Sequence, residues 1–235
     1  RDGRAAVQDE GSQLVAAALA AVPVTGTAGE RWLDLCAGPG GKAGLLGALA
    51  VQRGAQFVAS DVSEHRVDLV RATLRPVVAA GAPGQVTVRV GDVRDIGTDE
   101  PESFDRVMVD APCTGLGALR RRPEARWRKQ PTDVTQLAVL QRQLLTSALD
   151  ATRAGGVVAY VTCSPHLAET VFTVRDIVKK RPDVEVLDAR NWLRDKHGQP
   201  IPGSGSGPFA QLWPDVHGTD GMFLALLRRG SREHP

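Results

Sequence analysis

The sequence predicts an α/β fold in which a mostly parallel β-sheet carries helices on both faces. Strand-like apolar runs alternate with amphipathic segments over nearly all 235 residues, and this alternation is typical of doubly wound sheets. Aromatic residues make up 4% of the chain. The apolar content therefore comes mainly from Ala, Val and Leu, as expected for a sheet that helices cover on both faces. No internal repeat is present, so we expect a single domain over residues 1–235.

A glycine-rich turn at residues 34–42, Asp-Leu-Cys-Ala-Gly-Pro-Gly-Gly-Lys, organises the chain. Residues 31–35 are predicted to form a short buried strand, and apolar residues recur at helical spacing after the turn. Such a turn brings backbone N–H groups and the positive end of a helix dipole to a ligand. It is typical of the nucleotide-binding corner of Rossmann-like folds. Residues 38–43 also fit the loose pattern G-x-G-x-x-A, so an NAD-dependent oxidoreductase is an alternative.

Composition and charge exclude several classes of protein. The formal charge of +2 is too small to indicate a nucleic-acid partner by itself. Three cysteines do not make a disulfide framework and favour free thiols in a reducing compartment. Neither a membrane span nor a signal peptide is predicted, so we expect a cytoplasmic protein. The chain opens on Arg1 rather than Met, which suggests a piece of a longer protein.

The remaining elements follow from apolar periodicity. Further strands are predicted at residues 56–61, 85–90, 104–110, 157–163, 184–187 and 222–227. Ser12 is expected to cap a first helix, and other helices are predicted at 64–80, 132–152 and 167–180. Pro76 is expected to kink or stop its helix, and the glycines at 155–156 to end the helix before them. Residues 23–30 and 198–207 are predicted loops.

Polar and sulfur-bearing side chains gather at the predicted strand ends. In open α/β sheets, ligands bind outside the carboxyl ends of the strands, so one rim is expected to hold Asp61, Asp92, Asp110, Cys113 and Cys163. A carboxylate at Asp61, about twenty residues past the glycines, suits ribose hydroxyls; the alternative is a loop residue that caps the next helix. Asp92 is either a turn residue or an acceptor for a base amino group.

The three cysteines differ in their surroundings. Cys36 lies inside the glycine turn and is expected to be a small core residue. Cys113 and Cys163 lie in loops of small residues that leave a thiol accessible, and a helix N-terminus after Cys163 would lower its pKa. A thiolate there suits attack on an electron-poor ring carbon. No C-x-x-C spacing occurs and the histidines lack metal-ligand spacing, so we predict no metal.

A basic segment follows the loop of Cys113. Residues 120–129 hold six cations and one indole, a combination that suits phosphate contacts and stacking on a base. The alternative is an ordinary solvated charged surface. Because the segment directly follows a predicted active-site loop, we expect RNA contacts from Arg120, Arg121, Arg122, Arg126, Trp127 and Arg128.

These motifs together resemble those of the S-adenosylmethionine-dependent RNA cytosine-C5 methyltransferases, and most closely the bacterial branch that methylates small-subunit ribosomal RNA. The matching segments span nearly the whole chain in order, at residues 7–13, 34–42, 61–66, 91–92, 110–115, 120–127, 162–165 and 217–223. The paired D-A-P-C and T-C-S motifs are highly specific, whereas the glycine turn is not. Position 114 is Thr where Ser is common in the family.

The resemblance implies a class I methyltransferase fold and a role for each site residue. Cofactor contacts would come from Cys36, Ala37, Gly38, Pro39, Gly40, Gly41, Lys42, Asp61, Arg66, Asp92 and Asp110. Asp61 would bind the ribose and Asp92 would lie near the adenine. Cys163 would add to C6 of cytosine, Asp110 would hydrogen-bond the ring at N3, and Cys113 would assist release of the methylated RNA. Lys42 would order Asp110 or cap the turn.

The resemblance also sets the expected partners and their alternatives. Family enzymes of this branch usually carry an N-terminal RNA-binding domain, which the resemblance does not locate in this chain. The expected substrate is 16S ribosomal RNA, with transfer RNA as an alternative, and the expected state is a monomer. A non-catalytic RNA-binding module is a further alternative, against which the two cysteines argue.

Overall fold

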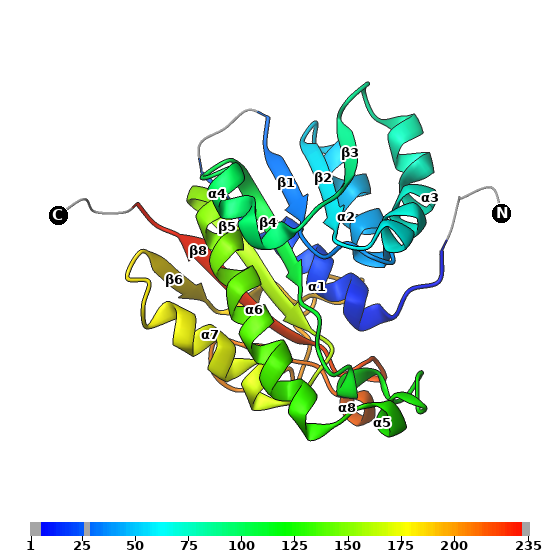
Figure 1. The fold of residues 1–235 in the computed structure, drawn as a ribbon, viewed down its shortest axis with the longest axis vertical. Helices are drawn as coiled ribbons and strands as arrows, with labels where there is room; N and C mark the ends of the chain where they lie inside the picture. Colours follow the sequence, from blue (N-terminus) through cyan, green and yellow to red (C-terminus); the bar gives the residue numbers. More distant parts are fainter. Residues whose placement is uncertain (1–5, 26–28, 232–235) are drawn as a thin grey trace.

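The computed structural model describes residues 6–25 and 29–231. Its centre is a mixed β-sheet with strand order β3-β2-β1-β4-β5-β8-β6, and β7 pairs with β8 (Figure 1). β3, β2, β1, β4 and β5 are parallel to one another. β8 runs antiparallel to β5, β6 and β7. The strands are β1 (Arg31–Asp34), β2 (Gln56–Asp61), β3 (Val86–Val90), β4 (Phe104–Asp110), β5 (Thr152–Thr162), β6 (Val184–Leu187), β7 (Ala210–Gln211) and β8 (Phe223–Arg229). The predicted doubly wound, mostly parallel sheet is confirmed.

Helices cover both faces of this sheet (Figure 1). They are α1 (Glu10–Ala21), α2 (Gly41–Gln52), α3 (Glu64–Ala80), α4 (Ile96–Asp99), α5 (Ala125–Arg128), α6 (Pro131–Ala151), α7 (Val171–Val178) and α8 (Pro214–His217). Short 3₁₀ segments add η1 (Val93–Asp95), η2 (Leu116–Ala118), η3 (Leu167–Glu169) and η4 (Ala189–Asn191). The prediction from periodicity missed these short elements, which carry too few residues to show a pattern.

Two hydrophobic cores lie on opposite faces of the sheet. Leu19 of α1, Leu46 of α2 and Leu74 of α3 belong to one core, and Leu145 of α6 and Ile177 of α7 belong to the other. Successive residues of β4 and β5 alternate between the two cores, because side chains of a strand point to opposite faces with a period of two. The fully apolar strands of the sequence are therefore buried on both sides.

Some predicted boundaries are wrong, for local reasons. Asp9, not Ser12, is the N-cap of α1, so Ser12 lies inside its first turn. Pro76 lies within α3 without ending it; Pro76 is exposed on the helix, where the carbonyl that loses its partner can be solvated. The segment predicted as a helix from 167 to 180 divides into η3 and α7.

The helix before β5 ends earlier than the glycines predict. It stops at Ala151, and Thr152 is already extended. Residues 154–156 lie within β5, where the pairing with β4 shifts register and Gly155 has a φ of +81°. The glycines therefore accommodate a strand irregularity rather than a helix end. Of the predicted loop at 23–30, residues 26–28 lie outside the described residues.

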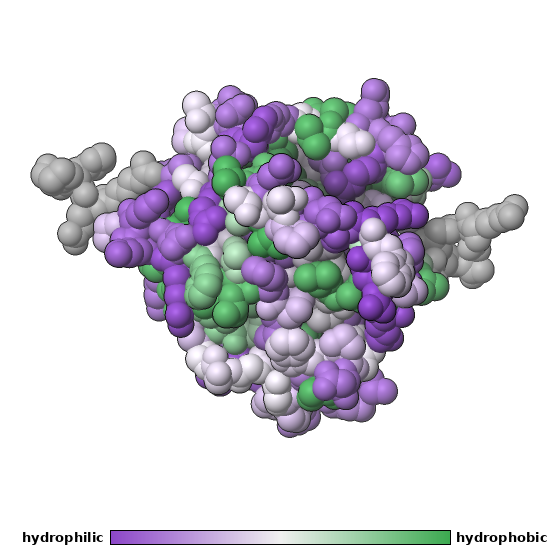
Figure 2. Space-filling view, turned by 60° about the horizontal axis from the view of Figure 1, so that its bottom comes forward, coloured by the Kyte–Doolittle hydropathy of each residue, from purple (hydrophilic) through white to green (hydrophobic). Residues whose placement is uncertain are grey.

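The surface shown in Figure 2 is mainly hydrophilic, and its hydrophobic residues form small groups between polar ones. Among residues 6–25 and 29–231, no helix has the length and apolar character needed to cross a bilayer.

Candidate functional site

The strand ends form two neighbouring cavities rather than one undivided rim. The first, of about 560 Å³, is lined by Cys163, Asp110, Lys42 and the basic residues Arg120, Arg121 and Arg122. The second, of about 290 Å³, is lined by Cys36, Asp61, Arg66 and Asp92. The glycine turn stands between them, because Cys36 faces the second cavity and residues 37–39 face the first.

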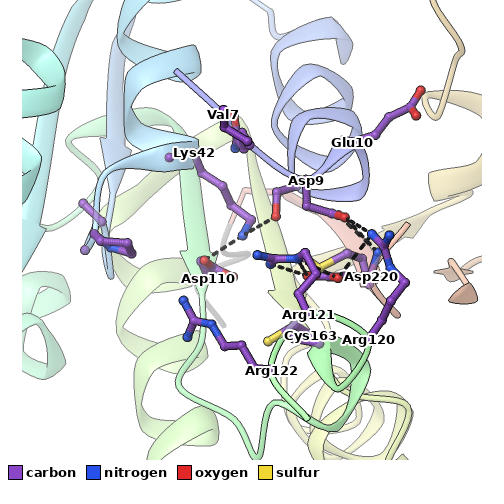
Figure 3. Close-up of a pocket in the computed structure, with 18 of the residues that line it drawn as sticks. Val7, Asp9, Glu10, Lys42, Asp110, Arg120, Arg121, Arg122, Cys163 and Asp220 are labelled. Carbon is purple, nitrogen blue, oxygen red and sulfur yellow. Dashed lines mark hydrogen bonds and ion pairs between the residues drawn. The ribbon is translucent and has the colours of Figure 1, made fainter. Parts of the chain in front are cut away.

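The two loop cysteines meet at this site. Cys113 follows β4 and Cys163 follows β5, and their Sγ atoms lie 3.4 Å apart. Adjacent parallel strands β4 and β5 end at the same edge, and this adjacency brings residues fifty positions apart into contact. Cys163 lines the first cavity, so its sulfur lies where a substrate can reach it (Figure 3).

The cysteines are electrostatically unequal. The hydrogen bond from Cys113 lowers the pKa of Cys163, against burial and the charge of Asp110, with Lys42 assisting. The same hydrogen bond, together with burial, raises the pKa of Cys113 well above its usual value. At a pH where one of the two ionises, Cys163 therefore carries the negative charge and Cys113 the proton.

Lys42 and Asp110 form an ion pair across the first cavity. Lys42 lies in the first turn of α2, and its Nζ is 2.8 Å from Oδ2 of Asp110 at the end of β4 (Figure 3). Burial opposes the charge on Lys42, yet the neighbouring Asp110 carboxylate raises the pKa of the lysine. Lys42 thus contacts Asp110, the first of its two predicted roles.

Asp61 contacts the glycine turn, Arg66 and the residue before α3. Its Oδ2 accepts from the backbone N of Gly38 at 3.1 Å and pairs with Arg66 at 3.3 Å. Its Oδ1 accepts from the backbone N of Ser63, directly before α3. A side chain at position 38 would approach Arg66 and Asp61 within 2.7 Å, so glycine is required there. Asp61 both shapes the start of α3 and lines the second cavity.

Asp92 likewise shapes a turn and lines the second cavity. Its Oδ1 accepts from the backbone N of Arg94, and the Arg94 guanidinium lies against its carboxylate. These hydrogen bonds from Arg94 lower the pKa of Asp92 to about 2. Leu140 and Leu144 of α6 form an apolar wall of the same cavity.

The glycine turn contributes to the site unevenly. Ala37, Gly38, Pro39, Gly41 and Lys42 line the first cavity. Cys36 is buried in one of the two cores and also borders the second cavity, and burial raises its pKa. Gly40 lines neither cavity. It has a φ of +112°, and a Cβ there would lie 2.8 Å from Oγ1 of Thr73, so Gly40 permits the turn to pack on α3.

Two of the predicted RNA-contacting arginines are paired within the protein. Arg120 lies 2.8 Å from Asp9 Oδ1, and both Asp220 oxygens accept from Nε of Arg121 at 2.9 Å (Figure 3). The Asp9 and Asp220 side chains are 2% exposed. These ion pairs join the start of α1, the loop after β4 and the segment before β8 around the first cavity.

The other four predicted RNA-contacting residues are exposed and have no ion pair among the described residues. Arg122, Arg126, Trp127 and Arg128 lie on and beside α5, and we call them the α5 basic surface. Trp127 is 77% exposed, and the Arg126 guanidinium lies 4.8 Å from the centre of its ring.

Three buried carboxylates of this region were not predicted as site residues: Asp34, Asp220 and Glu169. Neither Asp34 oxygen has a hydrogen-bond partner among the described residues, and burial raises its pKa to about 8. A sequence signal existed for Glu169, because it lies four and eight residues before the buried Thr173 and Ile177. An acid on the buried side of a predicted helix needs buried partners.

A tight backbone contact fixes the loop after Cys113. Gly117 donates from its backbone N to the carbonyl of Cys163, and its own carbonyl accepts from Gly221. A Cβ at position 117 would lie 2.1 Å from the Gly221 oxygen. Within the described part of the chain, no group of His, Cys, Asp or Glu residues is arranged to hold a metal ion.

Comparisons with known proteins agree with this geometry. A family model described as 16S rRNA methyltransferase RsmB/F matches residues 21–228. The chain is similar to a Mycobacterium tuberculosis protein named as a methyltransferase, with 58% identity over 97% of this chain and 47% of that protein. A Bacillus subtilis protein named as a ribosomal RNA small subunit methyltransferase B is 33% identical over 97% of this chain and 48% of its own length.

Two further comparisons concern substrate and fold. A mitochondrial tRNA (cytosine(34)-C(5))-methyltransferase of Danio rerio is 36% identical over 71% of this chain and 45% of that protein. The crystal structure of PH0851 superimposes with a TM-score of 0.82 at 29% identity, covering 97% of this chain and 47% of that one. The chain thus spans about half the length of the curated relatives it matches.

The predicted resemblance and the class I methyltransferase fold are confirmed by the family match and the superposition. The expected dependence of the family on S-adenosylmethionine is confirmed with them. The chain belongs to the RsmB/F family of 16S ribosomal RNA methyltransferases.

Proposed function

We propose that this chain transfers a methyl group from S-adenosylmethionine to C5 of a cytosine in RNA, with Cys163 as the nucleophile. The observation that carries the proposal is the 3.4 Å approach of Cys113 and Cys163 beside the Lys42–Asp110 ion pair. Cys163 lines the same cavity as Lys42 and Asp110. A purely structural role for the two thiols would not explain this placement.

The second cavity fits the adenosine part of the cofactor. Asp61 offers a carboxylate for ribose hydroxyls, Asp92 lies near the expected adenine, and Leu140 and Leu144 offer apolar contacts to a flat ring. When bound, S-adenosylmethionine supplies an electrophilic methyl group on a sulfonium.

The residues of the first cavity would carry the chemistry on the base. The Cys163 thiolate forms a bond to C6, which breaks ring conjugation and makes C5 nucleophilic. Asp110 takes up a proton and donates a hydrogen bond to N3, where negative charge develops. After C5 gains the methyl group, its proton leaves to solvent and the Cys163–C6 bond breaks. Cys113, whose sulfur lies 3.4 Å from that of Cys163, donates its S–H to the departing sulfur.

The α5 basic surface is the proposed RNA contact. Its exposed cations suit phosphates, and the exposed Trp127 ring suits stacking on an unpaired base. Arg120 and Arg121 would act instead by holding the walls of the first cavity through Asp9 and Asp220. A cytosine reaches Cys163 only from a single strand or after flipping out of a duplex.

Small-subunit ribosomal RNA is the proposed substrate, on the family match and the Bacillus subtilis relative. Transfer RNA is the alternative, since the Danio rerio relative is named for it. Bisulfite sequencing of ribosomal and transfer RNA from cells with and without the encoding gene decides between them. The NAD-dependent alternative is not supported by the comparisons, which match methyltransferases.

The catalytic assignment is tested by two cysteine variants incubated with RNA and labelled cofactor. Cys163→Ala is expected to abolish methyl transfer, because the C6 adduct cannot form. Cys113→Ala is expected to accumulate a protein–RNA complex that survives denaturant. Normal turnover by Cys163→Ala would overturn the assignment, and RNA binding without any transfer by the wild-type protein would favour the non-catalytic alternative.

A further inference from the structure

Glu169 is a fully buried carboxylate that contacts the loops of both cysteines. Its Oε1 accepts from the backbone N of Thr114 at 2.8 Å and from Nε2 of Gln141 at 3.3 Å. Its Oε2 accepts from the hydroxyls of Thr114 at 2.5 Å and Ser164 at 2.6 Å. Four donors therefore converge on the two oxygens, an arrangement that suits a carboxylate, which accepts and does not donate.

The residues that Glu169 binds are the immediate neighbours of the two sulfurs. Thr114 follows Cys113 after β4, and Ser164 follows Cys163 after β5. One side chain thus joins two irregular loops within one residue of each thiol. The sheet places the ends of β4 and β5 side by side. Beyond the strands, a backbone hydrogen bond from Gly117 to the Cys163 carbonyl and a 3.4 Å contact between the Thr114 and Ser164 hydroxyls also join the loops. Glu169 is the side chain that binds both of those hydroxyls.

Glu169 is itself fixed on several sides. The Tyr160 hydroxyl donates to its backbone carbonyl at 2.8 Å, and its backbone N donates to the carbonyl of His166. Gln141 of α6, which donates to Oε1, also donates to the carbonyl of Pro112 at 2.9 Å. Because the Glu169 side chain is closely packed, it cannot relax when one loop shifts. A shift of one cysteine loop is therefore passed to the other.

The charge of Glu169 acts on the two sulfurs unequally. After the Cys163 hydrogen bond and burial, the nearby negative charges of Cys163 and Glu169 raise the pKa of Cys113. The charges that act most on Cys163 come from the other side, from Asp110, Lys42 and Asp220. Glu169 therefore favours a neutral Cys113.

We propose that Glu169 is a positioning residue for the cysteine pair: its buried carboxylate joins the two loops within one residue of each thiol and sets which of the two sulfurs reacts. The proposal deepens the proposed function, on which its catalytic meaning rests. The proposal concerns the separation and the reactivity of the two thiols, which can be measured without RNA.

The first test measures the alkylation of each cysteine in the folded chain with iodoacetamide, by peptide mass spectrometry across pH 6–10. In the wild type we expect Cys163 to react faster than Cys113. In Glu169→Gln, which keeps the size and removes the charge, Cys113 is expected to react faster, so the ratio of the Cys163 rate to the Cys113 rate should fall severalfold. Glu185→Gln, at an exposed position of β6, is the matched control and is expected to leave the ratio unchanged.

The second test measures the proximity of the two sulfurs. Diamide, a diazene oxidant, takes two electrons and two protons from the thiol pair; a Cys113–Cys163 disulfide forms and diamide is reduced to the hydrazine. Ser164→Ala removes one hydroxyl link and leaves the charge of Glu169 in place. We expect this variant to slow disulfide formation severalfold while it keeps most of the alkylation preference for Cys163.

The outcomes separate the proposal from loss of folding. Cys36 is buried and is expected to stay unreactive in every folded variant, so its alkylation reports an opened structure. If Glu169→Gln opens the structure, Glu169→Asp and Ser164→Ala carry the test. A folded Glu169→Gln with wild-type rate ratio and wild-type disulfide rate would overturn the proposal. If the alkylation preference for Cys163 depends on Glu169 but the wild-type chain transfers no methyl group, the proposed function is refuted and the positioning role of Glu169 stands.

Discussion

Cys113 and Cys163 share a hydrogen bond at 3.4 Å between sulfur atoms fifty residues apart in sequence. When one of the two thiols ionises, both sulfurs share the remaining proton, so removal of one member changes the acidity of the other. The predictions that follow concern this pair, the ion pair beside it, the buried carboxylate behind it and the basic surface at its entrance.

Replacement of Cys113 is expected to make Cys163 less acidic. The hydrogen bond from Cys113 is the largest influence that lowers the pKa of Cys163, so Cys113→Ala should shift the alkylation of Cys163 to higher pH. The measurement is the pH dependence of the Cys163 alkylation rate. Cys36→Ala, which alters a thiol outside the pair, is the control. An unchanged midpoint in Cys113→Ala would mean that the two sulfurs do not share a proton in solution.

Loss of the Lys42 charge is expected to impair methyl transfer. Lys42→Met keeps most of the side-chain volume and removes the ammonium 2.8 Å from Asp110. We expect kcat to fall by roughly two orders of magnitude, at the low end of what a proton-handling group contributes. Because Lys42 also lowers the pKa of Cys163, the pH profile should move to higher pH. Lys42→Arg, which keeps the charge, should retain part of the activity; equal losses in both variants would indicate a packing role.

Asp34 is expected to make the fold less stable as the pH rises. Its pKa is about 8 in the folded protein against 3.8 for an ordinary aspartate, so the folded state holds the proton that the unfolded state loses. Stability from this group is complete below pH 3.8 and declines by about 1.4 kcal/mol per pH unit as the pH approaches 8.

The test of Asp34 is urea unfolding of the wild type and Asp34→Asn at pH 5, 6, 7 and 8. Asn does not titrate, so the stability gained by the variant should increase with pH and level off above pH 8. Asp68→Asn, at an exposed carboxylate paired with Arg71, is the control for loss of a surface charge. A stability difference that is independent of pH would contradict the high pKa of Asp34.

Removal of the α5 basic surface is expected to weaken RNA binding and its dependence on salt. The triple variant Arg122→Ala, Arg126→Ala, Arg128→Ala removes three exposed cations, and the slope of log affinity against log salt should decrease by about 2, at roughly 0.7 per phosphate contact on a single strand. Removal of Arg175, Lys179 and Lys180, exposed residues at the end of the sheet that α7 covers, is the charge-matched control. If the slope of log affinity against log salt is equal in the two triple variants, the α5 basic surface is an ordinary solvated surface without a specific RNA contact.

Much of the fold follows from local sequence, whereas the grouping of charges does not. The bounds of β2, β4, β6 and α3 agree with the prediction from the sequence. β2 and β4 are almost continuously buried, whereas α3 buries one face at helical spacing through Val67, Val70 and Leu74. The pairing of Arg121 with Asp220 joins residues 99 positions apart, and no local pattern carries that information. The basic segment therefore gave the same prediction for Arg121 as for Arg122, although Arg121 is ion-paired with Asp220 and Arg122 has no ion pair among the described residues.

The candidate site shows the same limit. Strand-end residues were correctly expected at one edge of the sheet, and the cysteines meet there. The division into two cavities depends on the path of the glycine turn, which residue types alone do not determine. Glu169 was missed because its importance comes from Thr114 and Ser164, whose loops come together only in three dimensions.

The contact of Gly117 with Gly221 and Cys163 limits how the site can be re-engineered. Any larger residue at 117 would enter the space of two backbone carbonyls, so saturation libraries that include this position would mostly yield misfolded loops. Variation aimed at new target nucleotides belongs instead at positions such as Arg122 and Trp127, where side chains meet solvent and a new shape leaves the sulfur geometry intact.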